Sequence, residues 1–131
     1  MSKELKDILR ILQSERRRIV LELLLDLQIE EGSETVTVRV SDLGRQVAAE
    51  EADVDSESVG RTVQRSSDIG LKHTHLPMLD DYGVVNFDEH AMKVSSTNQT
   101  EPLAQLMKRI VDVVDESEIR ITGSYYSDRV L

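Results

Sequence analysis

Residues 71–94 read LKHTHLPMLDDYGVVNFDEHAMKV, and this stretch predicts a helix, a tight stop and a β-hairpin. Gly83 follows the apolar helical stripe at the place where a left-handed residue commonly ends a helix. The run 84–87 is rich in β-prone side chains and predicts a strand, and 88–90 predicts a tight polar turn. The chain is then expected to return as a second strand at 92–94.

Two helices, a strand and a third helix are expected ahead of this stretch. Ser2 is placed to cap a first short helix, and Ser14 a second one that runs to about Gln28. The second helix is apolar on nearly every side, which predicts that it is the central, buried helix. The β-branched run 35–38 predicts a short strand, and Ser41 is expected to cap the third helix.

The segment 58–82, just before the hairpin, has a helical but interrupted pattern. Val59 and Val63 face one way, and the polar residues at 66–70 predict a bend or a break into two helical pieces. Pro77 lacks an amide hydrogen and predicts a kink in the second piece or, alternatively, the start of that piece.

A C-terminal helix follows a polar linker, which divides the chain into a domain of residues 1–98 and a helix with a tail, residues 99–131. Thr100 is expected to cap this helix, with Pro102 in its first turn, and 119–121 predicts a short β-like piece. The apolar stripe of the helix predicts a homodimer interface, and packing on its own domain is the alternative. The side chains expected at the interface are Leu103, Leu106, Met107, Ile110, Val111 and Val114.

The order of these elements predicts a mainly helical α+β fold with a small antiparallel β-hairpin wing. A helical core followed by a hairpin, with the early strand pairing onto it, is the arrangement of a winged helix-turn-helix domain. The last helix is an addition to that domain.

Composition limits the class of protein. A chain of 131 residues has room for one domain, and its lack of cysteine removes disulfide frameworks, thiol catalysis and zinc fingers. No apolar run approaches the roughly 18–20 residues of a membrane helix, and the charged N-terminus does not resemble a signal peptide. We therefore expect a cytoplasmic protein without a metal or cofactor. No catalytic motif is present, so we do not expect an enzyme.

The net charge of −9 is unevenly distributed. Many carboxylates, 11 Arg against 5 Lys, and few aromatics are typical of a surface suited to high salt, and an acidic mesophilic protein is the alternative. Two local basic islands remain, with net charges of +3 at 1–20 and +2 at 58–79. An anionic partner can bind there because the local field matters more than the total charge.

Three blocks of sequence carry a resemblance to a known family. They are SERRRIVL at 14–21, LKHTHLPML at 71–79 and YGVVNFD at 82–88. These blocks resemble the S-x-R-R-R, H-T-H-L-P-x-L and G-V-V-x-Y/F-D patterns of the ArsR-like winged-helix regulators of haloarchaea, over roughly residues 9–95. The resemblance implies a DNA-binding transcriptional regulator that is usually dimeric.

The second basic island holds the candidate DNA contacts. Arginine can bind guanine and phosphate, and glutamine can read adenine, in the major groove. A basic face that is merely solvated is the alternative. The predicted DNA contacts are Arg61, Gln64, Arg65, Lys72, His73 and Thr74.

Arg16, Arg17 and Lys93 are candidate phosphate contacts. For the two arginines, pairing with nearby acidic groups is the alternative, because cations in the first turn of a helix oppose its macrodipole. His75 falls on the apolar stripe and is interpreted as a buried, hydrogen-bonded histidine, whereas His73 lies outside it. The two histidines are about 200° apart around a helix and cannot chelate one metal ion.

Two functions are compatible with these patterns. The first is a regulator that binds promoter DNA as a homodimer, and the basic islands favour it. The second is a winged-helix protein-interaction module that does not bind DNA, and the acidic wing turn favours it. The sequence identifies no small-molecule effector.

Overall fold

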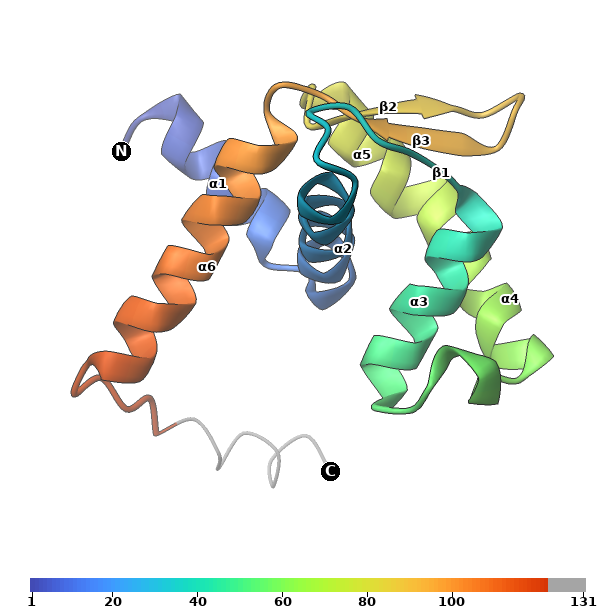
Figure 1. Cartoon of the computed structure of the whole chain (residues 1–131). Helices are drawn as coiled ribbons and strands as arrows, with labels where there is room; N and C mark the ends of the chain where they lie inside the picture. The colour runs from blue at the N-terminus through green and yellow to red at the C-terminus, as the bar shows by residue number, and fades with distance from the viewer. Residues whose placement is uncertain (123–131) are drawn as a thin grey trace.

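The computed structural model describes residues 1–122 of the chain, in which a small sheet lies at one edge of a group of helices (Figure 1). The mainly helical α+β fold with an antiparallel wing is confirmed. The elements in chain order are α1 (Lys3–Leu12), α2 (Glu15–Glu31), β1 (Thr37–Arg39), α3 (Val40–Ala52), a 3₁₀ turn η1 (Ser56–Ser58), α4 (Arg61–Gly70), a π-helical turn η2 (Leu71–His75), α5 (Leu76–Asp81), β2 (Val85–Asp88), β3 (Lys93–Ser96) and α6 (Thr100–Glu116).

Three local signals act as expected at helix ends. The hydroxyl of Ser2 accepts a hydrogen bond in the first turn of α1, and the hydroxyl of Ser14 does so in α2. Gly83, at φ 73°, follows α5 in the left-handed conformation. The amide of Gly83 donates to the backbone carbonyl of Asp80 at 2.8 Å, and the amide of Val84 donates to the carbonyl of Leu79 at 2.9 Å. This Schellman arrangement turns the chain from α5 into the hairpin.

Two expected caps are wrong. The third helix begins at Val40, one residue before Ser41, and has no side-chain cap. The Thr100 hydroxyl does not cap α6, because it donates to the carbonyl of Val84 at 2.6 Å and accepts from the amide of Thr97. It therefore fastens the start of α6 to the start of the hairpin, which is a tertiary role that the local pattern does not reveal.

The sheet is antiparallel in the order β1-β3-β2. Val38 pairs with Val94, which pairs in turn with Phe87, so that these three side chains share the inner face. Arg39 and Lys93 are paired on the outer face. The first strand is thus an edge strand of the hairpin, as expected, although it spans Thr37–Arg39 rather than 35–38.

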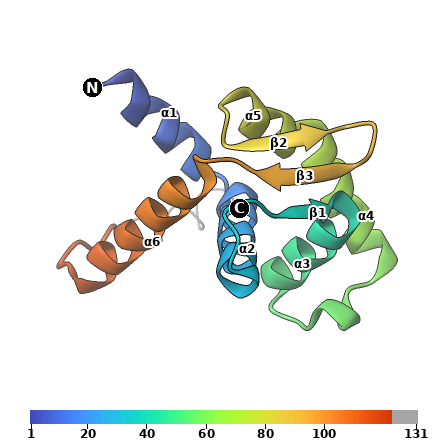
Figure 2. The ribbon, with the colours of Figure 1, turned by 45° about the horizontal axis from the view of Figure 1, so that its top comes forward.

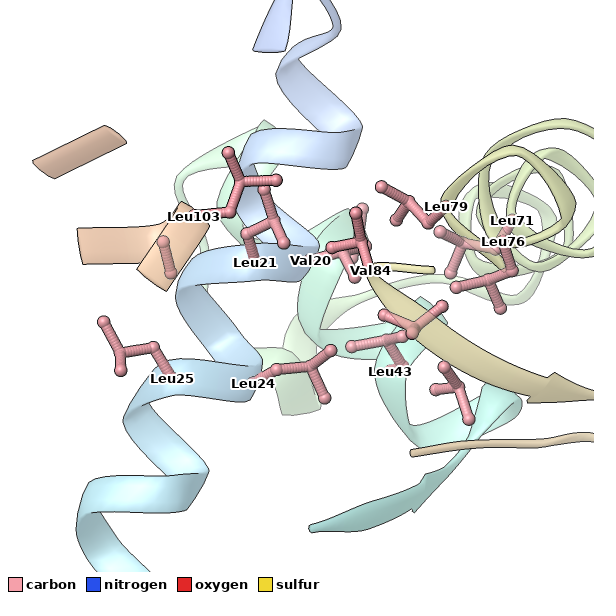
Figure 3. Close-up of a cluster of buried hydrophobic side chains, with 14 of the residues drawn as sticks. Val20, Leu21, Leu24, Leu25, Leu43, Leu71, Leu76, Leu79, Val84 and Leu103 are labelled. Carbon is pink, nitrogen blue, oxygen red and sulfur yellow. The ribbon is translucent and has the colours of Figure 1, made fainter. Parts of the chain in front are cut away.

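The core is built around α2, as its apolar composition predicts. This helix extends to Glu31, past the expected end at Gln28. Leu21 lies beside Leu103 of α6, Leu25 points to the same side of α2, and Leu24 points toward Leu43 of α3 (Figure 3). Apolar burial of this kind, from both sides of one helix, is the main favourable term in folding.

The interruption before the hairpin lies at η2, and not at 66–70 as expected. The amide of Leu76 donates to the carbonyl of Leu71, five residues back. Pro77 follows at the start of α5 and has no amide to continue the α-helical pattern. This confirms the alternative in which Pro77 marks the start of the second piece, and the wider turn lets both leucines reach the core.

The elements from α2 to β3 therefore form a winged helix-turn-helix, in which α3 and α4 are the paired helices and β2 and β3 the wing (Figure 2). In both views α6 diverges from this domain. Residues 119–121 form no strand, so that expectation is wrong. Within residues 1–122, no helix is long and apolar enough to cross a membrane.

Candidate nucleic-acid interface

The run of α4 and η2 presents a polar outer face. Arg61, Arg65, His73 and Thr74 are exposed, and Lys72 is half-buried. Thr62 and Ser66 are also exposed on this surface, and sequence reasoning missed both. Together these groups offer hydrogen-bond donors and acceptors along one helix surface.

Gln64 does not belong to this outer face. Its amide nitrogen donates to the backbone carbonyl of Ser41 at 3.1 Å, and its oxygen accepts from Nε of Arg45 at 3.3 Å. Gln64 is half-buried and joins α4 to α3. The prediction that it is exposed beside Arg61 is therefore wrong.

Small and polar residues form the inner face of α4. Val63 was expected on a common face with Val59 opposite the basic residues, but it is 53% exposed. Ser67 is fully buried instead, and a Cβ on Gly44 would overlap Oδ1 of Asp68. The missing side chain at Gly44 lets α3 and α4 approach closely.

Asp68 is the only carboxylate between residues 58 and 79, and this contact turns it toward α3. Burial raises the pKa of Asp68, and the positive charge of Arg45 opposes that rise. Among the described residues, its Oδ1 has no hydrogen-bond partner. The outer face of α4 thus carries no exposed carboxylate.

The side chain of Arg17 is buried and makes its hydrogen bonds inside the protein. Its side chain is 6% exposed, and its guanidinium donates to the carbonyls of Ile11 at 2.8 Å and Arg10 at 2.7 Å. These carbonyls lie at the C-terminal end of α1, where the helix macrodipole favours a cation. The structure contradicts a phosphate contact by Arg17, because the guanidinium is enclosed.

His75 completes this buried cluster, which we call the Arg17 cluster: Arg17, His75 and the carbonyls of residues 10 and 11. Nδ1 of His75 lies 3.2 Å from Nη1 of Arg17. Because the guanidinium can only donate, this nitrogen must be unprotonated. Burial lowers the pKa of His75, Arg17 and Arg16 lower it further, and Glu51 opposes them. The interpretation of His75 as a hydrogen-bonded histidine is confirmed, but the residue is half-buried rather than buried.

Arg16 lies beside the same cluster. Its Nε donates to both carboxylate oxygens of Glu51, at 3.2 and 3.0 Å, across the surface of Gly70. A side chain at position 70 would collide with the guanidinium. Of the two readings given for Arg16, the structure shows pairing with an acidic group.

Lys93 is exposed on the outer face of the wing, between Arg39 and Asp88 on the neighbouring strands. Sequence reasoning missed Arg39, which becomes a neighbour of Lys93 only through the strand register. The carboxylate of Asp88 accepts from the amides of His90 and Ala91 at 3.0 and 2.9 Å. Asp88 therefore stabilises the wing turn through these hydrogen bonds, and it also gives the turn a negative charge.

The apolar stripe of α6 divides into two halves. Leu103 is 8% exposed and Met107 is also buried, because both pack within their own chain. The expectation that they lie at a dimer interface is wrong, and Leu106 is half-buried in the same packing. The second half continues the stripe beyond that contact, with Ile110, Val111, Val113 and Val114 exposed at 41%, 51%, 65% and 45%.

Comparison with known proteins places the chain in one family. Residues 9–95 match the model of a domain of unknown function (DUF7344), and the chain belongs to that family. No curated protein and no solved structure matches the chain. Within residues 1–122, no three His, Cys, Asp or Glu side chains are grouped so as to hold a metal ion.

Proposed function

We propose that this member of the DUF7344 family is a cytoplasmic transcriptional regulator that binds promoter DNA as a homodimer through its helix-turn-helix. The observation that carries the proposal is the outer face of α4 and η2. Arg61 and Arg65 are exposed there, while the one carboxylate of the segment, Asp68, is turned inward. A helix with such a face fits the major groove, where arginine can contact phosphate or guanine.

The charge distribution explains how an acidic protein can bind DNA. A net charge of −9 repels a polyanion at long range, but salt screens that repulsion beyond about 10 Å at 0.1 M. The basic groups act at contact distance. Lys93 on the wing and Arg39 on the neighbouring strand β1 supply a second basic position for the phosphate backbone.

The homodimer is supported by the second half of α6. Ile110, Val111 and Val114 continue the stripe that packs on α2, yet the chain supplies nothing to cover them among its described residues. A second copy would bury these side chains and present two recognition helices to paired half-sites.

Removing the exposed arginines of α4 tests the DNA proposal. The double variant Arg61→Ala with Arg65→Ala should bind promoter DNA more weakly, and each lost phosphate contact should reduce the salt slope by about 1. The matched control, Lys6→Ala with Arg109→Ala, removes the same charge from exposed positions on α1 and α6. Fluorescence anisotropy over a salt series measures both. Equal losses in the two double variants would contradict the proposal, because they would show a response to net charge alone.

A charge placed on the exposed half of α6 tests the dimer. Val111→Asp with Val114→Asp should yield a folded monomer, since both side chains are exposed in the single chain. Gln105→Asp adds a charge to an exposed polar position of the same helix and should leave the dimer intact. Light scattering gives the mass and circular dichroism the fold. A wild-type protein that is monomeric at micromolar concentration would contradict the dimer.

A protein-interaction module remains the second candidate, and the acidic wing favours it. Asp88 and Glu89 occupy the wing turn, where a wing that touches phosphate would carry basic residues. In that case the protein forms no DNA complex at any salt concentration and co-purifies with a protein partner. Genome-wide footprinting separates the two, because a regulator is enriched at discrete promoters.

A further inference from the structure

Ile69 lies within the polar outer face of α4. Its neighbours at i−4 and i+4 are Arg65 and His73, and those at i−3 and i+3 are Ser66 and Lys72. Residues at these spacings share one surface of a helix. The only apolar side chain among them is therefore surrounded by groups that can donate or accept hydrogen bonds.

The fold gives no reason for an isoleucine at this position. Ile69 is 52% exposed, while the core contacts of the helical run are made by Leu71, Leu76 and Leu79. A β-branched side chain is also a poorer helix former than most polar alternatives. An exposed isoleucine that neither packs nor favours the helix is suited to an apolar group outside the chain.

We propose that Ile69 determines specificity by packing against the 5-methyl group of a thymine in the major groove. This inference rests on the proposed function, in which α4 enters that groove. The edges of the four base pairs there carry donors, acceptors and one apolar group, the thymine methyl. Arg65 and His73 contact polar groups on either side, and Ile69 selects the thymine between them.

Val63 is a matched control. It is 53% exposed, almost the same as Ile69, and it lies on the same helix. Six residues of an α-helix advance about 600°, so Val63 and Ile69 point about 120° apart. Truncation of either residue removes a similar exposed apolar surface, but only Ile69 lies between Arg65 and His73 on the outer face.

The experiment removes the methyl group from the DNA. Duplexes that the full-length protein selects from a random-sequence pool are remade with each thymine replaced singly by uracil, which differs only by the 5-methyl group. One replacement should weaken wild-type binding about fourfold in each half-site, the value of one buried methyl group. Ile69→Ala should be insensitive to that replacement, and Val63→Ala should respond as the wild type does.

Each outcome is decisive. If wild-type binding is insensitive to every replacement, or if Ile69→Ala remains as sensitive as the wild type, the role of Ile69 is overturned while DNA binding stands. If no duplex is retained by any of the three proteins, the proposed function and this inference fail together. Because both side chains are exposed, circular dichroism should show all three proteins equally folded.

Discussion

The arginines that begin α2 and those of α4 have opposite fates in the same fold. Arg16 and Arg17 lie in the first turn of α2, and both are held by groups of the protein itself. Arg61 and Arg65 lie at the start of α4, and both are exposed. The difference does not come from the arginines or their place in a helix. It comes from what faces them, which is Glu51 of α3 and the end of α1 in one case and solvent in the other.

The largest effect should come from loss of the Arg17 guanidinium. Arg17→Met keeps much of the apolar stem but leaves the buried carbonyl of Ile11, the partly buried carbonyl of Arg10 and His75 without their donor, which should lower the free energy of unfolding by about 3 kcal/mol. Arg61→Met removes an exposed charge and should change it by less than about 0.5 kcal/mol. Urea denaturation at one fixed protein concentration measures both. Equal changes in the free energy of unfolding for the two variants would show that the buried contacts of Arg17 contribute no more to stability than the exposed side chain of Arg61.

The free energy of unfolding should depend on pH through His75, the histidine of the Arg17 cluster. The pKa of His75 is lower in the folded protein than in the unfolded chain, so the unfolded chain binds the proton more readily. Stability from this group is therefore present above about pH 6.5 and declines as the pH falls below that value. His75→Gln keeps an acceptor for Arg17 and should flatten that part of the stability curve.

The exposed His73 provides the control for this pH series. His73→Gln removes an imidazole two residues away, outside the Arg17 cluster. It should leave the decline below pH 6.5 as steep as in the wild type. If the two variants flatten the curve equally, the decline does not come from His75.

The smallest effect concerns Gly70, beside Arg16. Alanine favours a helix over glycine by about 1 kcal/mol, but its Cβ would displace the guanidinium from Glu51. Gly70→Ala should therefore be close to neutral in the wild type and stabilising by about 0.5–1 kcal/mol in an Arg16→Ala background. A double-mutant cycle by urea denaturation gives the difference. Full stabilisation in the wild-type background would show that Arg16 moves aside at no cost.

Local chemistry predicted those parts of the fold in which a residue acts on its own neighbours. Ser2, Ser14 and Gly83 stabilise helix ends through the adjacent turn of backbone, and no distant partner is needed. The order of elements then restricted the topology enough to indicate the wing. The apolar surround of α2 likewise predicted its central place, because burial on all sides requires partners on all sides.

The remaining features depended on partners far away in sequence. Thr100 has the chemistry of a cap, but the carbonyl of Val84 is 16 residues away and accepts its hydrogen bond. Arg17 meets His75 across 58 residues. Helix periodicity placed Val63 opposite the basic residues but carried no information on Gly44, whose missing side chain leaves room for Asp68. These features arise when helices and strands that are distant in sequence pack together. The pattern of residues within one helix or strand does not predict such contacts.

The π-helical turn at η2 has a consequence for how the length of this chain can change. In a regular α-helix Leu76 would lie about 140° past Leu71, and the wider π-helical turn at η2 reduces that offset, so that both leucines reach the core. Deleting the exposed Thr74 would place Leu76 four residues after Leu71, a spacing that an ordinary α-helical turn keeps on one face, so both leucines should still reach the core. Natural relatives should accordingly tolerate loss of one residue at 71–76 but not gain of one, whereas the exposed segment 53–60 should accept both, because a change of length there alters no helical phase.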